Sequence, residues 1–237
     1  MTRITDPRPA RRILLVAALV ALLLLLALVA DRVLHARAEA RIAGQITEAM
    51  SLEEEPDITV DGFPFLTQLA AGELSSVRGA AEGVVLDTPD QAVEIRRVRV
   101  HARQVTTGDP ARVGDLRLSG TVTDATIRSW VRDRLPGAEV ATTDAGVEIS
   151  GELLGLPVAL DAEPQVREDA LVVQVTGARL GDGAVELATL RSLVPDDLLE
   201  LEIDVSDLPL GLRPEAAETV DGGVRLSLSG RDVTLAP

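Results

Sequence analysis

Residues 93–102 read VEIRRVRVHA, a stretch in which apolar and charged side chains alternate. An apolar residue at every second position is the pattern of a β-strand that places one face on a core. Arg96 and Arg97 shift this alternation by one residue, as a β-bulge does. The stretch therefore predicts a sheet with one apolar face and a bulge in this strand.

The same alternation recurs along the chain from residue 57 onward. Turn signals separate the alternating segments, among them DTPD (87–90), TDAG (143–146) and DGG (221–223). Strands that follow one another through short turns pair antiparallel. One helix is expected to interrupt them from Asp124, whose carboxylate can cap the first amides of that helix. We predict an α+β fold with a long antiparallel sheet.

One face of the strand at 93–102 is basic. Arg97, Arg99, His101 and Arg103 recur at every second residue, so they point to one side of the sheet. Arginine forks on one face can hold a phosphate headgroup. Ion pairs with Asp and Glu on neighbouring strands are the more common use of such a face. The sequence leaves both interpretations open.

An uninterrupted apolar run, Ile13–Ala30, precedes the sheet. A helix of this length spans about 27 Å, close to the hydrocarbon thickness of a bilayer. The four arginines within residues 1–12 would keep that segment in the cytoplasm and place the remainder outside. The run exceeds the usual core of a signal peptide and lacks a small-x-small cleavage site. A retained transmembrane anchor is therefore favoured over a cleaved signal.

An amphipathic helix is predicted to continue from the anchor to Met50, before a connection that ends near Pro56. Its apolar stripe is formed by Leu34, Ala38, Ile42 and Ile46. Such a stripe suits a helix packed on a sheet or a helix lining a lipid groove, and periodicity alone favours packing. The expected domains are a cytoplasmic N-terminus (1–12), a transmembrane anchor (13–30), a helix with its connection (31–56) and a β-rich domain (57–237).

Composition argues against several classes of function. The chain carries 38 acidic and 23 basic residues, for a net charge of −15, which repels nucleic acid. It has no cysteine, so disulfides and thiolate metal sites are excluded. Its two histidines, His35 and His101, are far apart, and no nucleophile elbow, phosphate-binding loop or complete calcium loop occurs. We expect neither an enzyme nor a cofactor.

Both phenylalanines of the chain fall within GFPFLTQL, residues 62–69. One interpretation is a packed corner, in which Pro64 fixes the backbone and the rings fill the core. In the other interpretation, the rings line an apolar pocket or face lipid. Periodicity favours the packed corner, and the pocket stays open.

This motif also carries a resemblance to a known family. Residues 57–84, DITVDGFPFLTQLAAGELSSVRGAAEGV, resemble the opening of the actinobacterial LmeA-like phospholipid-binding family, as does the order of anchor, helix and acidic Pro turn before them. LPLGLR (208–213) and GVRLSLSGRDVTL (223–235) resemble its ending. The resemblance spans nearly everything after residue 35. It departs at PEAAE (214–218), where an alternating strand is expected, and this predicts an irregular last hairpin.

The resemblance implies a non-enzymatic cell-envelope protein that binds phospholipid. It implies a fold similar to tubular lipid-binding proteins, with a long curved antiparallel sheet wrapped around the N-terminal amphipathic helix and an apolar groove. The residues expected at that groove are Ile42, Ile46, Phe63, Phe65, Leu66, Leu69 and Trp130. The basic residues expected to contact a headgroup are Arg97, Arg99, His101 and Arg103.

The expected location is the cell membrane, crossed once, with the C-terminal domain on the extracytoplasmic side. The expected partners are phospholipid and the cytoplasmic membrane, and the expected role is maintenance of envelope lipid or lipoglycan. A structural partner of an envelope glycan or lipid enzyme, with a filled core and no lipid cargo, is the alternative. A hydrolase would require acids, or Ser and His, that only folding brings together.

Overall fold

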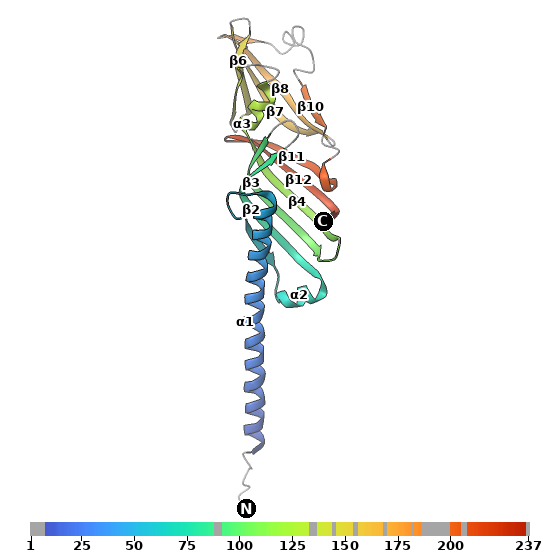
Figure 1. Cartoon of the computed structure of the whole chain (residues 1–237). Coiled ribbons are helices and arrows are strands. Elements are labelled where there is room, and N and C mark those ends of the chain that lie inside the picture. The colour runs from blue at the N-terminus through green and yellow to red at the C-terminus, as the bar shows by residue number, and fades with distance from the viewer. Residues whose placement is uncertain are drawn as a thin grey trace, which may run out of the picture.

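A long N-terminal helix leads into two antiparallel sheets that lie one beyond the other (Figure 1). The computed structural model describes residues 8–87, 92–132, 137–143, 146–153, 156–167, 170–181, 183–185, 200–204 and 208–235. The helices are α1 (Arg8–Met50), α2 (Phe65–Ala71), α3 (Asp124–Arg132) and the 3₁₀ turn η1 (Pro209–Gly211).

All strand pairings are antiparallel in the described part of the chain. The first sheet has the order β1 (Asp57–Asp61), β2 (Glu73–Asp87), β3 (Ala92–Thr106), β4 (Ala111–Thr123), β12 (Gly223–Leu235) and β11 (Arg213–Val220). The second sheet has the order β10 (Glu200–Asp204), β8 (Ala170–Leu180), β7 (Leu156–Arg167), β6 (Gly146–Leu153) and β5 (Glu139–Thr143), with β9 (Gly183–Val185) paired to β8.

The α+β class and the antiparallel pairing are confirmed, but the strands form two sheets rather than one long sheet. The division falls at α3, because β4 runs directly into this helix at Asp124. Helical backbone makes its hydrogen bonds within itself, so the strand ladder cannot continue through α3. The next strand, β5, begins the second sheet.

Both irregularities expected from the sequence are present. The pairing of β3 with β4 shifts register between Arg96 and Arg99, and Arg97 adopts a φ of 50°. The pairing of β11 with β12 shifts between Pro214 and Ala216. Proline has no amide hydrogen to give to the ladder, which is why it occurs at such bulges.

The predicted anchor and amphipathic helix form one continuous helix of 43 residues, α1. It is the one described helix that is long and apolar enough to cross a membrane. The side chains of residues 15–30 are exposed, and burial begins at Asp31. The apolar half of α1 therefore extends beyond the folded sheets, as Figure 1 shows.

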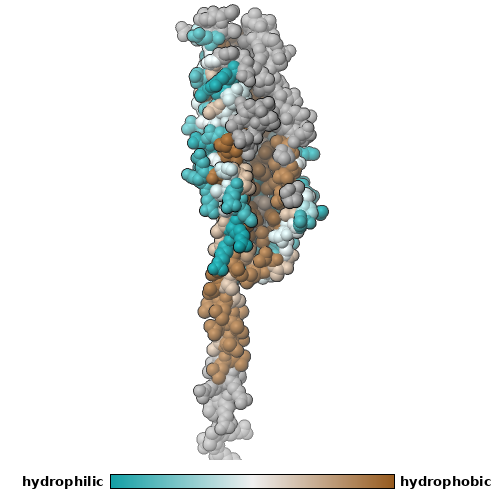
Figure 2. All heavy atoms as spheres, in the orientation of Figure 1, coloured by the Kyte–Doolittle hydropathy of each residue, from teal (hydrophilic) through white to brown (hydrophobic). Residues whose placement is uncertain are grey.

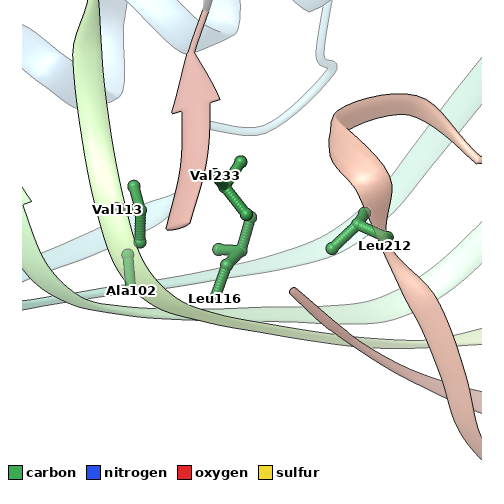
Figure 3. Close-up of a cluster of buried hydrophobic side chains, with 5 residues drawn as sticks. All are labelled: Ala102, Val113, Leu116, Leu212 and Val233. Carbon is green, nitrogen blue, oxygen red and sulfur yellow. The ribbon is translucent and has the colours of Figure 1, made fainter. Parts of the chain in front are cut away.

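Three hydrophobic clusters form the described core. Figure 3 shows the cluster between β3, β4, β12 and the segment after η1, formed by Ala102, Val113, Leu116, Leu212 and Val233. A second cluster lies at the α1 end of the first sheet and contains Val60, Phe65 and Leu74. The third joins the two sheets through Val140, Val147 and Val224.

Candidate functional site

Two side chains of α1 hydrogen-bond the backbone of β1, the edge strand of the first sheet. His35 Nε2 donates to the carbonyl oxygen of Val60 (2.7 Å), and the Val60 amide donates to Glu39 Oε1 (2.8 Å). An edge strand leaves backbone groups without a neighbouring strand, and these contacts supply partners for both groups of Val60. They fix α1 along the edge of the sheet.

The buried side of α1 differs in part from the predicted stripe. Ala38 and Ile42 pack against the Val60 cluster, and Ile46 is half-buried, as the periodicity indicates. Leu34 is 42% exposed, so its assignment to the stripe was wrong. Asp31 and His35 take this side instead, because their polar groups have partners there.

Helix α2 docks on the first turns of α1 that follow the exposed apolar run. Asp31 Oδ1 accepts a hydrogen bond from the Leu66 amide at 2.8 Å. This carboxylate serves as a cap from outside α2, whose own N-cap, Pro64, has no side-chain hydrogen bond to offer. The guanidinium carbon of Arg32 lies 5.1 Å from the ring centroid of Phe63.

The two phenylalanines have opposite environments. Phe65 is 4% exposed and stacks on His35 with ring centroids 5.1 Å apart. Phe63 is 60% exposed and Leu69 is 50% exposed, while Leu66 is half-buried. The packed-corner interpretation therefore describes Phe65. Phe63 is not packed in the core, and for this ring the pocket or lipid interpretation stays a prediction.

Trp130 lies away from this group. It is half-buried on α3, which contacts β5 at the junction of the two sheets. Helices α2 and α3 lie at opposite ends of the first sheet (Figure 1). Ile42, Phe65 and Leu66 therefore lie together where α1 packs on the first sheet, whereas Trp130 lies on α3, at the opposite end of that sheet.

An apolar face of the first sheet extends from the place where α1 packs on it. Register aligns Val100 of β3, Leu118 of β4 and Leu228 of β12 in one row across three neighbouring strands. All three side chains are half-buried and pack against the cluster of Figure 3. Figure 2 shows hydrophobic surface that runs from the exposed part of α1 onto the sheet, beside the polar side chains of the helix. The chain itself covers this face only in part.

The basic residues lie on the other face of the sheet, since side chains alternate along each strand. Arg99 and His101 line a hollow of about 440 Å³ together with Arg78 of β2 and Arg117 of β4. The acids Asp57 and Glu215 also line it, as do Val100, Leu118 and Leu228, which cross the sheet at this place. Register explains the grouping, because His101 pairs with both Arg78 and Arg117. The sequence pattern did not reveal Arg78 or Arg117, because strand register is required to place them here.

The other two predicted basic residues are placed differently. Arg97 falls in the bulge and lines a separate, polar cavity with residues 50–54, at the C-terminal end of α1. Its guanidinium donates to the carbonyl of Asp221 at 3.5 Å. Arg103 is exposed and lies beyond the hollow, opposite Ser76 and Asp115. The bulge separates Arg97 from the other three residues, whereas Arg103 keeps their period and lies two residues further along β3 than His101.

Of the basic residues that line the hollow, Arg78 forms an ion pair. Its Nε donates to Asp61 Oδ2 at 2.8 Å and its Nη2 donates to Oδ1 at 2.5 Å. The Arg78 hydrogen bonds hold the pKa of Asp61 below its ordinary value, against an opposing effect of burial, and Ser76 and His101 add to the lowering. The same pair raises the pKa of Arg78. Arg99 and Arg117 have no ion-pair partner within the described residues.

A comparison with known protein families identifies the family of this chain. A family model described as LmeA-like phospholipid-binding matches residues 29–229. The chain belongs to this family. The match confirms the resemblance predicted from the GFPFLTQL motif, and it covers the second sheet, α2, the part of α1 that packs on β1 and the first sheet up to residue 229 of β12. No curated protein and no solved structure matches this LmeA-like chain.

The described residues of this LmeA-like protein contain no group of three or more His, Cys, Asp or Glu side chains that could hold a metal ion. The family description concerns phospholipid binding. The arrangement that the fold offers to a phospholipid is an apolar face beside α1 on one side of the first sheet and a basic hollow on the other.

Proposed function

We propose that this protein is anchored in the cytoplasmic membrane by α1 and binds the acyl chains of a phospholipid on the apolar face of the first sheet. The row formed by Val100, Leu118 and Leu228 carries the proposal, because these apolar side chains are half-buried and only partly covered by the chain. An acyl chain laid along them would complete their burial. Ile42, Ile46 and Leu66 would border the lipid on the α1 side.

Burial alone supplies the affinity in this proposal. Each acyl methylene transferred from water to an apolar surface gains about 0.8 kcal/mol. Two acyl chains would therefore bind without a specific code for the headgroup, and binding requires no chemical step. The protein holds or carries lipid and is not an enzyme.

The proposed topology follows from charge. Four arginines within residues 1–12 precede the apolar run and favour a cytoplasmic N-terminus. Both sheets would then lie on the extracytoplasmic side, in the cell envelope. There the protein would support the maintenance of envelope lipid or lipoglycan.

Native mass spectrometry of the full chain, purified from membranes in mild detergent, tests lipid binding. Neighbouring residues of β4 provide matched variants, because Leu118 packs against the apolar cluster, whereas Ser119, the next residue along the strand, points to the opposite face. We expect the wild type and S119D to retain a phospholipid adduct and L118D to lose it. Far-UV circular dichroism would confirm that both variants fold.

The alternative function is a structural partner of an envelope glycan or lipid enzyme. An apo mass for the wild type, with no lipid taken up from added vesicles, would contradict lipid binding and favour this alternative.

We propose that Arg99, His101 and Arg117 bind a phosphate group in the basic hollow, on the face of the sheet opposite the one proposed for the acyl chains. Two arginines without ion-pair partners among the described residues support this, because the chain as a whole is strongly acidic. Arg97 and Arg103 lie outside the hollow and are not part of this proposal.

A further inference from the structure

Helix α2 packs on the residues of α1 that come directly after its exposed apolar run. Leu66 and Phe65 of α2 contact Asp31 and His35, and Phe63, just before α2, contacts Arg32. These α1 residues lie within five positions of Ala30, the last residue of the run. At the rise of an α-helix, these contacts all fall within about 8 Å of the end of the run. A membrane around the apolar run would therefore have its surface at the level of α2.

The surface of α2 suits that position. The helix reads FLTQLAA and has no charged residue. Phe65 points inward, whereas Phe63 and Leu69 are 60% and 50% exposed. Amphipathic and aromatic side chains favour the interface between water and the hydrocarbon of a bilayer. The Arg32 guanidinium over the Phe63 ring fits the same layer, where arginine reaches lipid phosphates and aromatic rings reach the acyl region.

Two features keep α2 in place. The Asp31 side chain is 3% exposed and joins α1 to the start of α2 through the Leu66 amide. Gly62 turns the chain with a φ of 106°, and a Cβ at this position would lie 2.4 Å from the Gln68 Nε2 atom. The turn before α2 therefore requires glycine, and the hydrogen bond from the Leu66 amide to Asp31 ties the start of the helix to α1.

We infer that α2 and the turn before it form a membrane-contact element that inserts Phe63 and Leu69 into the interfacial layer of the bilayer that α1 crosses. The inference rests on the proposed anchoring by α1. It adds that the α2 end of the apolar face meets the membrane directly. Acyl chains could then pass between the bilayer and the sheet without crossing water, since the hydrophobic surface is continuous there (Figure 2).

Single-tryptophan reporters in full-length protein test the depth of α2. Trp130 is the one tryptophan of the chain, so W130F provides a background without tryptophan. F63W places the reporter on the proposed contact. V85W is a matched control, because Val85 is 58% exposed and lies about 40 Å along β2 from its first residue, Glu73, which follows α2. L22W reports whether α1 is inserted. Each variant is reconstituted in phosphatidylglycerol–phosphatidylethanolamine vesicles that carry a quencher on the acyl chains.

We expect quenching of L22W and F63W, a blue-shifted emission for F63W, and water-like, unquenched emission for V85W. Quenching of L22W with F63W as water-exposed as V85W would overturn the inference and leave the anchor intact. Absence of quenching for L22W would remove the anchor and the inference with it. The lipid adduct measured by mass spectrometry is independent of these outcomes, so a failure of lipid binding would be recognised separately.

Discussion

At the residue scale, Phe63 and Phe65 show what the sequence could not decide. Both belong to one motif, and the sequence allows a packed ring or an outward ring at either position. The docking of α2 on α1 makes the choice, because His35 stacks on Phe65 while Arg32 lies over the exposed Phe63. These two contacts join residues about thirty positions apart, so no local sequence pattern could predict them.

This difference predicts unequal effects on stability. F65A should lower the free energy of unfolding by about 3–5 kcal/mol, because it leaves a cavity among Val60, Leu74 and α1. F63A should change it by less than about 0.5 kcal/mol, since the ring is mostly exposed. Urea unfolding in one detergent, followed by circular dichroism, measures both. Equal losses for the two variants would show that Phe63 is also packed.

A second residue-scale prediction concerns pH. Arg78 lowers the pKa of Asp61, whose ordinary value is 3.8, so the native state favours the ionised carboxylate. This contribution to stability is present above pH 3.8 and is lost as the pH falls through the lower, native pKa. D61N should therefore melt below the wild type at about pH 7, and the difference should shrink below about pH 3.8.

Melting temperatures of the wild type, D61N and D57N from about pH 7 to about pH 2.5 test this expectation. Asp57 is an exposed acid on the same strand that acts on Arg78 through its charge alone, so D57N is the control for loss of a charge without loss of the hydrogen bonds. A gap between D61N and the wild type that stays constant with pH would contradict the role of the Asp61 charge.

At the scale of elements, periodicity predicted the strands well and their association less well. The phase shift at Arg96 and Arg97 predicted the bulge of β3, because a bulge changes which side chains share a face. The grouping of Arg78 and Arg117 around His101 depends on register with two other strands, so it could not be predicted from one strand. The division into two sheets likewise depends on how α3 packs.

The basic hollow gives the prediction for these elements. R99A/R117A should weaken binding of inorganic phosphate and of dihexanoyl phosphatidylglycerol by at least about tenfold, because each arginine forms charge-assisted hydrogen bonds. Isothermal titration measures both ligands, and tighter binding of the lipid would identify a headgroup as the source of the phosphate.

R112A/R231A is the matched control, since it removes the same charge from exposed sites outside the hollow. An equal loss of binding in this variant would indicate general electrostatic attraction rather than a site.

At the scale of the whole molecule, the junction of the two sheets determines whether the domain behaves as one unit. The sequence suggested that the Asp124 carboxylate caps α3, but the Thr123 hydroxyl accepts the hydrogen bond from the Thr126 amide instead. Asp124 is used across the junction: its Oδ1 accepts from the Thr142 hydroxyl at 2.6 Å and its Oδ2 from the Thr142 amide at 3.3 Å. Side chains that join elements in this way cannot be distinguished from local caps by spacing alone.

This bridge predicts coupled unfolding of the two sheets. In the wild type, Trp130 fluorescence on α3 and far-UV circular dichroism should lose their native signals at the same urea concentration. D124A should lower stability by about 1–3 kcal/mol, because it leaves the buried Thr142 without its partner, and the Trp130 transition should then precede the circular dichroism transition. E139A is a close control: Glu139 also joins β5 to α3, through an ion pair with Arg128 at 3.4 Å in which the Glu139 side chain is 74% exposed, and its loss should cost less than about 1 kcal/mol. If both transitions of D124A still coincide, the apolar cluster of Val140, Val147 and Val224 couples the sheets without the bridge.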